Sequence, residues 1–123
     1  MKITLLTDDS IRLEPVPGQL TVEAPTAEQI YSPFHMLASG LAVCTFSILE
    51  SWASNAKLDT SDLSIDVAWS FVEKPHRIGT IDVTFRWPSL PDARRVTAQR
   101  VAELCPIHKT LMIAPTINMA AVS

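Results

Sequence analysis

The residues of this 123-residue chain that are best suited to chemistry are its two cysteines, Cys44 and Cys105. Cys105 stands directly before Pro106 and three residues before His108, so a helical turn over "CPIH" would bring the imidazole near the thiol. Backbone N–H groups at the start of such a turn favour the thiolate, which is the nucleophilic form of cysteine. The short motif "CPIH" therefore marks Cys105 as a candidate reactive thiol.

Cys44 lies in the middle of the segment "SPFHMLASGLAVCTFSILESWAS", which has no charged residue between Met36 and Leu49. A thiol buried among apolar side chains has a raised pKa and is inert unless a cation lies beside it. The alternative interpretation of both cysteines is that they are small hydrophobic core residues with no chemical role. A further alternative is a hydrolase in which Cys44 acts as the nucleophile with His35 or His108.

The sequence gives little sign of a metal, cofactor or nucleic-acid site. The histidines and cysteines do not fall into metal-ligand spacings such as C-x-x-C, so we expect no metal. With only three glycines there is no phosphate-binding or dinucleotide fingerprint, and we expect no cofactor. The net charge is −3 and the ten basic residues are scattered, which disfavours nucleic acid as a partner.

The high apolar content predicts that the chain associates with further copies of itself. Hydrophobic residues make up 47% of the chain and the mean hydropathy is +0.20, more than a chain of this size can bury alone. The run from Met36 to Leu49 is shorter than the roughly 18 to 20 residues that span a bilayer. The segment "MKITLLTDDS" turns acidic too early for a signal peptide. We therefore expect a cytoplasmic homo-oligomer with no membrane partner.

We expect the helices and strands that position the cysteines to form a single domain, residues 1–123. Three short strand-like runs, "KITLLTD", "SIRLEPV" and "QLTVEAP", are separated by Asp8-Asp9 and by the turn from Pro15 to Gly18. Ser32 is a favourable N-cap and Pro33 a favourable first helical residue, so a helix is predicted from there to about Asn55.

The second half of the chain predicts a hairpin, a helix and a strand. "DLSIDVAWSFVE" and "IGTIDVTFRW" alternate apolar and polar residues, which is typical of antiparallel strands. "DARRVTAQRVAEL" is an amphipathic helix that ends at Cys105, because Pro106 disfavours helical geometry in the preceding residue. "PIHKTL" is expected to form a short turn or helix and "MIAPTINMAAV" a final strand. The predicted fold class is α+β.

The central helix, residues 33–55, is apolar on all its sides between Met36 and Leu49, so it must be covered on all its sides. One sheet covers only one flank of a helix. The other flank is expected to pack on the same helix of a second subunit, related by a two-fold axis. This predicts that the helix is the spine of a dimer.

Two segments resemble signatures of the OsmC/Ohr family. "SPFHMLASGLAVC" is similar to the family's Asn/Ser-Pro segment that ends in cysteine, and "AELCPIHKTL" to its Cys-Pro-Val/Ile segment. The resemblance implies an OsmC-like fold and an intertwined homodimer with two interfacial sites. It also implies reduction of organic hydroperoxides, in which Cys44 becomes a sulfenic acid and Cys105 resolves it as a disulfide, with a thiol reductant to restore the pair. The residues expected to contact substrate are Phe34, Leu37, Leu41 and His108.

The chain departs from the family peroxidases at their activating residues. Those enzymes use an arginine from the N-terminal arm, for which Arg12 is the one candidate here, and hold it with a glutamate after the helix-start proline. Phe34 occupies that glutamate position, and His35 occupies the slot used by another branch. His35 is a candidate orienting group or proton donor. The alternative function is a protein without peroxidase activity that binds a small lipophilic ligand in the same pocket.

Overall fold

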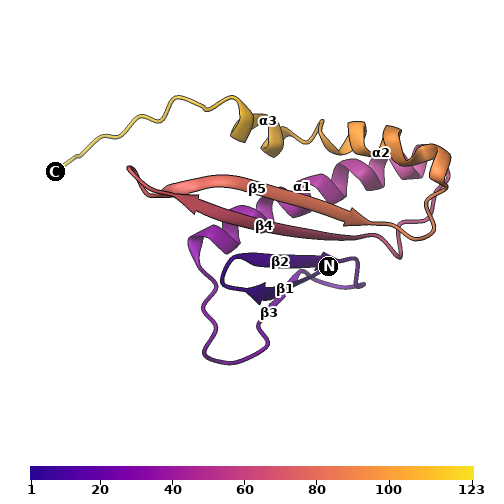
Figure 1. Cartoon of the computed structure of the whole chain (residues 1–123), viewed down its shortest axis with the longest axis horizontal. Coiled ribbons are helices and arrows are strands. Elements are labelled where there is room, and N and C mark those ends of the chain that lie inside the picture. The colour runs from indigo at the N-terminus through magenta and orange to yellow at the C-terminus, as the bar shows by residue number, and fades with distance from the viewer.

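The computed structural model describes all 123 residues, which form one five-stranded sheet and three α-helices. The order across the sheet is β3-β1-β2-β4-β5, with antiparallel pairs except for β3, which runs parallel to β1. This architecture, drawn in Figure 1, confirms the predicted α+β class. The elements are β1 (Lys2–Thr7), β2 (Ser10–Glu14), β3 (Thr21–Glu23), α1 (Pro33–Asn55), β4 (Ser64–Val72), β5 (Arg77–Arg86), a 3₁₀ turn (Asp92–Arg94), α2 (Arg95–Ala102) and α3 (Pro106–Met112).

The sheet has one apolar face and one polar face, because its strands alternate as the sequence predicts. The register aligns Ile11 with Val67 and Val67 with Val83, so these side chains share one face of the sheet. Ile11 and Val67 are buried in the core beneath α1, whereas Val83 is more exposed. The neighbouring residues Arg12 and Asp66 are paired on the opposite face. The apolar face and α1 together form the hydrophobic core. Its fully or nearly fully buried members from the sheet are Ile3, Ile11, Leu13, Ile65, Val67 and Trp69.

The start and the end of α1 agree with the prediction. Ser32 is the N-cap, and its hydroxyl accepts a hydrogen bond from the backbone N–H of His35. Pro33 is the first helical residue, where its missing N–H costs nothing. The helix ends at Asn55, and Lys57 follows in the left-handed region with φ of 58°. Local capping rules are therefore sufficient to place this helix.

The single chain covers α1 on only part of its circumference. Ala38, Ala42 and Leu49 are buried against the sheet, and α2 and α3 pack along a second flank. Met36 remains 54% exposed, and Gly40 is also exposed. The helix is long and apolar enough to cross a membrane by length and composition, with a mean hydropathy of 1.4 over 18 residues, but here it is the core helix of the fold.

The predicted C-terminal strand is not formed in the single chain. Residues 114–123 make no backbone hydrogen bond, and Ile117, Met119 and Val122 are each more than 80% exposed. A strand exists only through pairing, and α3 delivers the chain past the tip of the β4–β5 hairpin, away from the sheet (Figure 1). The outer edge of β5 is unpaired, but residues 114–123 form no backbone hydrogen bond with it in the single chain.

Candidate thiol site

Cys44 on α1 and Cys105 at the start of α3 are neighbours in the fold. Cys105 is fully buried and is the N-cap residue of α3, where its sulfur accepts a hydrogen bond from the backbone N–H of His108 at 3.4 Å. The predicted capping role of this thiol is therefore confirmed. The helix begins there because Pro106 is favourable at its first position and unfavourable to continuation of the preceding helix.

Cys44 is only partly exposed, and its pKa is raised above the ordinary value of a thiol. The main cause is burial, which disfavours the charged thiolate, and the second is the hydrogen-bonding interaction with the Cys105 thiol. The backbone N–H of Ile107 acts in the opposite direction and stabilises the thiolate. At neutral pH the accessible thiol is therefore mainly protonated, with a second thiol against it.

A groove runs beside the two thiols, between β5 and the helices, and consists of two adjoining cavities. The cavities have volumes of about 510 and 440 Å³, and they share Ile81, Val83 and His108. Such volumes are typical of sites for small molecules. Leu41 and Thr45, which are close to Cys44 along α1, line one cavity each, whereas neither thiol lines a cavity itself.

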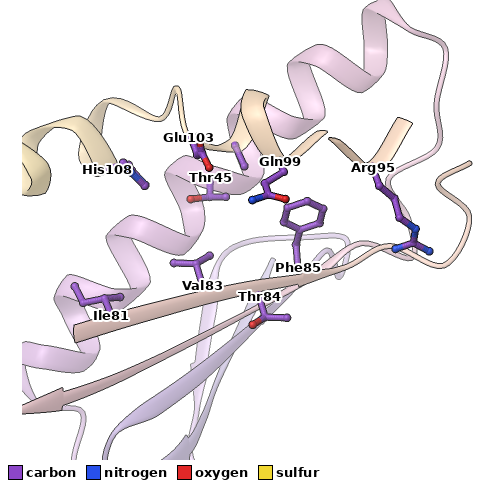
Figure 2. Close-up of a pocket in the computed structure, with 10 residues that line it drawn as sticks. Thr45, Ile81, Val83, Thr84, Phe85, Arg95, Gln99, Glu103 and His108 are labelled. Atoms are coloured by element: carbon purple, nitrogen blue, oxygen red, sulfur yellow. The ribbon is translucent and has the colours of Figure 1, made fainter. Parts of the chain in front are cut away.

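The two cavities differ in character. Figure 2 shows the larger one, where Val83 and Phe85 point from β5 toward the helices and Gln99 from α2 approaches Phe85. Its remaining polar lining comes from Thr45, Thr84, Arg95, Glu103 and His108. The smaller cavity is mainly apolar, and it is lined by Leu37, Leu41, Ile78, Gly79, Thr80, Ile81, Val83, His108, Leu111 and Met112. The groove therefore suits an apolar molecule with a polar end.

Three of the residues expected to contact substrate lie in this groove. Leu37 and Leu41 line its apolar half, and His108 lies where the two halves meet. Phe34 does not line it, because its ring packs edge-on against Phe71 with ring centroids 4.9 Å apart. Phe34 is thus a packing residue between α1 and β4.

Arg12 lies on the face of the sheet opposite to α1 and is bound to Asp66. Its Nε and Nη2 donate to the two carboxylate oxygens at 2.8 and 3.1 Å, and Arg86 lies 3.8 Å from the same carboxylate. This hydrogen-bonded ion pair raises the pKa of Arg12. Within one chain the guanidinium is therefore paired elsewhere and does not contact Cys44.

Both ring nitrogens of His35 are used within the protein. Its Nε2 donates to the carbonyl oxygen of Thr7 at 3.0 Å, and its Nδ1 accepts from the backbone N–H and the hydroxyl of Ser32. The ring is 2% exposed and packs edge-on against Trp69. His35 thus connects the start of α1 to the end of β1, and no nitrogen is free to reach a substrate.

Replacing His35 with alanine is expected to destabilise the protein by about 2–4 kcal/mol, because it removes the hydrogen bonds of the ring to Thr7 and Ser32 and opens a cavity beside Trp69. Urea unfolding of the variant and of the parent protein measures this difference. The exposed His76 is the matched control, and His76→Ala is expected to cost less than about 1 kcal/mol. Equal effects at the two positions would contradict the connecting role of His35.

Sequence reasoning missed the contribution of α2 to the groove. The amphipathic pattern of this segment predicts that Arg95, Gln99 and Glu103 face solvent, and of the residues in α2 only Ala98 is fully buried. In the structure the same three residues, spaced at i, i+4 and i+8, border the larger cavity. That spacing was visible in the sequence, but nothing local indicated a groove opposite to it.

Comparison with protein families gives a match over most of the chain. The family model described as OsmC-like protein matches residues 26–120, which is most of the chain. The chain belongs to the OsmC-like family. The matched region includes both cysteines, α1, the β4–β5 hairpin and the groove.

A solved structure shares the fold of this OsmC-like protein. It is a proposed osmotic stress induced and detoxification response protein from Psychrobacter arcticus 273-4, with a TM-score of 0.58 and 22% sequence identity. The alignment covers 88% of this chain and 84% of that one. A search of curated proteins found no match. The OsmC-like chain contains no cluster of three or more His, Cys, Asp or Glu residues placed to hold a metal ion.

Proposed function

We propose that this OsmC-like protein reduces organic hydroperoxides through Cys44 and Cys105. The proposal is carried by the placement of two thiols that are remote in sequence: Cys105 is buried at the start of α3, and its thiol interacts with that of the partly exposed Cys44 on α1. A role in detoxification agrees with the description of the Psychrobacter protein. The two free thiols agree with a reducing compartment, which we take to be the cytoplasm.

The reaction has two steps, and a different sulfur is the nucleophile in each. The Cys44 sulfur attacks the terminal oxygen of the hydroperoxide, the O–O bond breaks, and the alcohol leaves with a proton as Cys44 becomes a sulfenic acid. The Cys105 thiol then attacks that sulfur, and water leaves as the disulfide forms. A dithiol reductant supplies two electrons and two protons to restore both thiols. Because Cys105 is fully buried, Cys44 is the sulfur that a hydroperoxide reaches first.

The test is to add one equivalent of cumene hydroperoxide to the reduced protein and to follow its intact mass and its free thiols. We expect the mass to fall by the two hydrogens of one internal disulfide, with no cross-linked subunits. An unchanged mass with both thiols free would contradict the proposed reaction.

The rate of this disulfide formation is expected to rise with pH between pH 7 and pH 9, by at most about tenfold per unit, because the fraction of reacting thiolate increases below the raised pKa of Cys44. The rate should level off only above the ordinary pKa of a thiol. Stopped samples analysed by mass give the profile. A rate independent of pH in this range would show that the thiol is already ionised and would contradict the prediction.

We also propose that the working form is a homodimer assembled through α1. Gly40 lies in the middle of this helix, where glycine costs about 1 kcal/mol relative to alanine. A Cβ added at Gly40 meets no atom within 4 Å, so nothing in the single chain requires glycine there. Close approach of a second helix gives a reason for it. In the same dimer, the exposed apolar residues of the C-terminal segment 113–123 would pack on the surface of the partner subunit.

A second function is favoured by the state of Cys44. Its raised pKa, the pairing of Arg12 with Asp66 and the lack of a carboxylate at Phe34 and His35 all lower the reactivity of the site. The alternative is that the groove binds a small lipophilic ligand and that the thiols do not turn over. In either case we take residues 1–123 as one domain.

A further inference from the structure

The larger cavity of the groove has a positive charge at one end. Arg95, Gln99 and Glu103 line this cavity and follow one another at intervals of four residues along α2 and its C-cap. Eight residues of helix extend over about 12 Å, so the opposite charges of Arg95 and Glu103 are well separated. Figure 2 shows Arg95 at one end of the cavity and His108 at the other, with the ring of Phe85 between them. An anion in this cavity is therefore attracted to the Arg95 end.

The guanidinium of Arg95 has donors that no group of the protein uses. Its Nε donates to the carboxylate of Asp92 at 2.8 Å, and neither Nη1 nor Nη2 makes a hydrogen bond within the chain. Arg94 precedes Arg95, so two arginines outweigh one aspartate at this end. A guanidinium with both terminal nitrogens free matches the two oxygens of a carboxylate. This end of the cavity therefore suits a carboxylate held by Nη1 and Nη2.

The guanidinium lies at the rim of the cavity and not inside it. The side chain of Arg95 is 60% exposed. A carboxylate bound at such a position keeps part of its water, which avoids the large free-energy cost of burying a charge. A hydrocarbon chain attached to that carboxylate instead gains free energy when it leaves water. The site can therefore hold the head group of an amphipathic anion at its rim and the apolar part inside.

Strand β5 gives the groove an apolar side that extends away from Arg95. Phe85, Val83 and Ile81 alternate along the strand and line the larger cavity, and Ile78 lines the smaller one. From Phe85 to Ile78 the strand extends over about 23 Å. The lining of the smaller cavity contains no Asp, Glu, Lys or Arg. An unbranched hydrocarbon chain can therefore lie along β5 from the charged end of the groove to the uncharged end.

We propose that Arg95 binds the carboxylate of an unbranched monocarboxylic acid whose hydrocarbon chain lies along β5 in the groove. This inference rests on the second function proposed above, since it names the class of ligand that the groove binds. Binding is non-covalent and requires no reaction at either thiol. A neutral alcohol of the same chain length has the same apolar part without the charge. Arg95 should therefore make the protein prefer the acid to the alcohol.

The test measures binding of decanoate and of decan-1-ol to the full-length protein by equilibrium dialysis. We expect the dissociation constant of decanoate to be at least about fivefold lower than that of decan-1-ol, because only the acid pairs with the guanidinium. A higher salt concentration should weaken binding of decanoate and leave binding of decan-1-ol unchanged, since salt screens a charge pair at an exposed rim.

Two arginine variants form a matched pair. Arg95→Gln and Arg94→Gln each remove one positive charge at the start of α2, but only Arg95 lines the cavity. Both side chains are exposed, so both variants should fold. Arg95→Gln should raise the dissociation constant of decanoate at least about fivefold and leave that of decan-1-ol within twofold. Arg94→Gln should change neither constant by more than twofold.

A third variant tests whether the chain lies in the groove. Val83 lines both cavities and is 36% exposed, so Val83→Ser removes apolar contact from the groove without opening the core. This variant should weaken binding of decanoate and of decan-1-ol alike. Binding of both ligands that does not respond to Val83→Ser would place them outside the groove and would overturn the inference.

The outcomes separate this inference from the proposed functions. If decan-1-ol binds in the groove as tightly as decanoate, or if the two arginine variants have equal effects, the role of Arg95 is overturned while ligand binding by the groove stands. If neither compound binds, both are overturned. The peroxidase proposal is tested separately, because cumene hydroperoxide has no carboxylate and its reaction should be unaffected by Arg95→Gln. Preference for decanoate together with unreactive thiols would support the inference and contradict the peroxidase proposal.

Discussion

Replacing Cys44 with serine is expected to slow hydroperoxide consumption by at least about 100-fold, because a hydroxyl is not ionised near neutral pH and does not reduce an O–O bond. The change is nearly isosteric at a partly exposed position, so the fold should be kept. Consumption of cumene hydroperoxide in the presence of excess dithiothreitol measures the effect. A variant that retains more than one tenth of the parent rate would contradict the attacking role of Cys44.

Cys105→Ser is the matched control, because it removes the second thiol and leaves the first. With one equivalent of hydroperoxide this variant should gain the mass of one oxygen, as the sulfenic acid of Cys44, instead of losing two hydrogens. An excess of hydroperoxide should then add a second oxygen irreversibly. Formation of a disulfide between subunits in the control would show that Cys44 faces a partner subunit, and it would contradict resolution within one chain.

Replacing Gly40 with tryptophan is expected to convert a dimer into monomers, with a dissociation constant raised by at least about 100-fold, because a large side chain prevents close approach of a second helix. The position is exposed and open within one chain, so the variant has room to fold. Sedimentation equilibrium of the parent protein and of the variant measures the change. A parent protein that is monomeric at all concentrations would refute the dimer.

Gly40→Ala is the matched control at the same position. In an isolated chain it should stabilise α1 by about 1 kcal/mol, because alanine has the higher helix propensity and its Cβ meets no neighbour. If a second helix packs closely on Gly40, the same methyl group should instead weaken the dimer. The sign of the change in unfolding free energy therefore distinguishes a free helix face from a packed one.

The local elements of this protein are determined by the sequence itself. Ser32 and Pro33 start α1 because an N-cap hydroxyl and a proline satisfy the unpaired groups of a first turn, whatever surrounds them. The alternation around Val67 and Val83 selects two strands and assigns their faces. Cys105 before Pro106 marks the end of one helix and the start of the next. Each of these signals acts over a few residues.

Only the tertiary structure decided which of these elements meet. The interaction of Cys44 with Cys105, the ion pair of Arg12 with Asp66 and the use of both nitrogens of His35 join residues that are far apart in the chain or on different elements. The same applies to the polar residues of α2, which border a groove instead of open solvent, and to residues 113–123, which pair with no strand in the single chain. Packing and pairing of this kind depend on the whole fold, so residue spacing alone could not determine them.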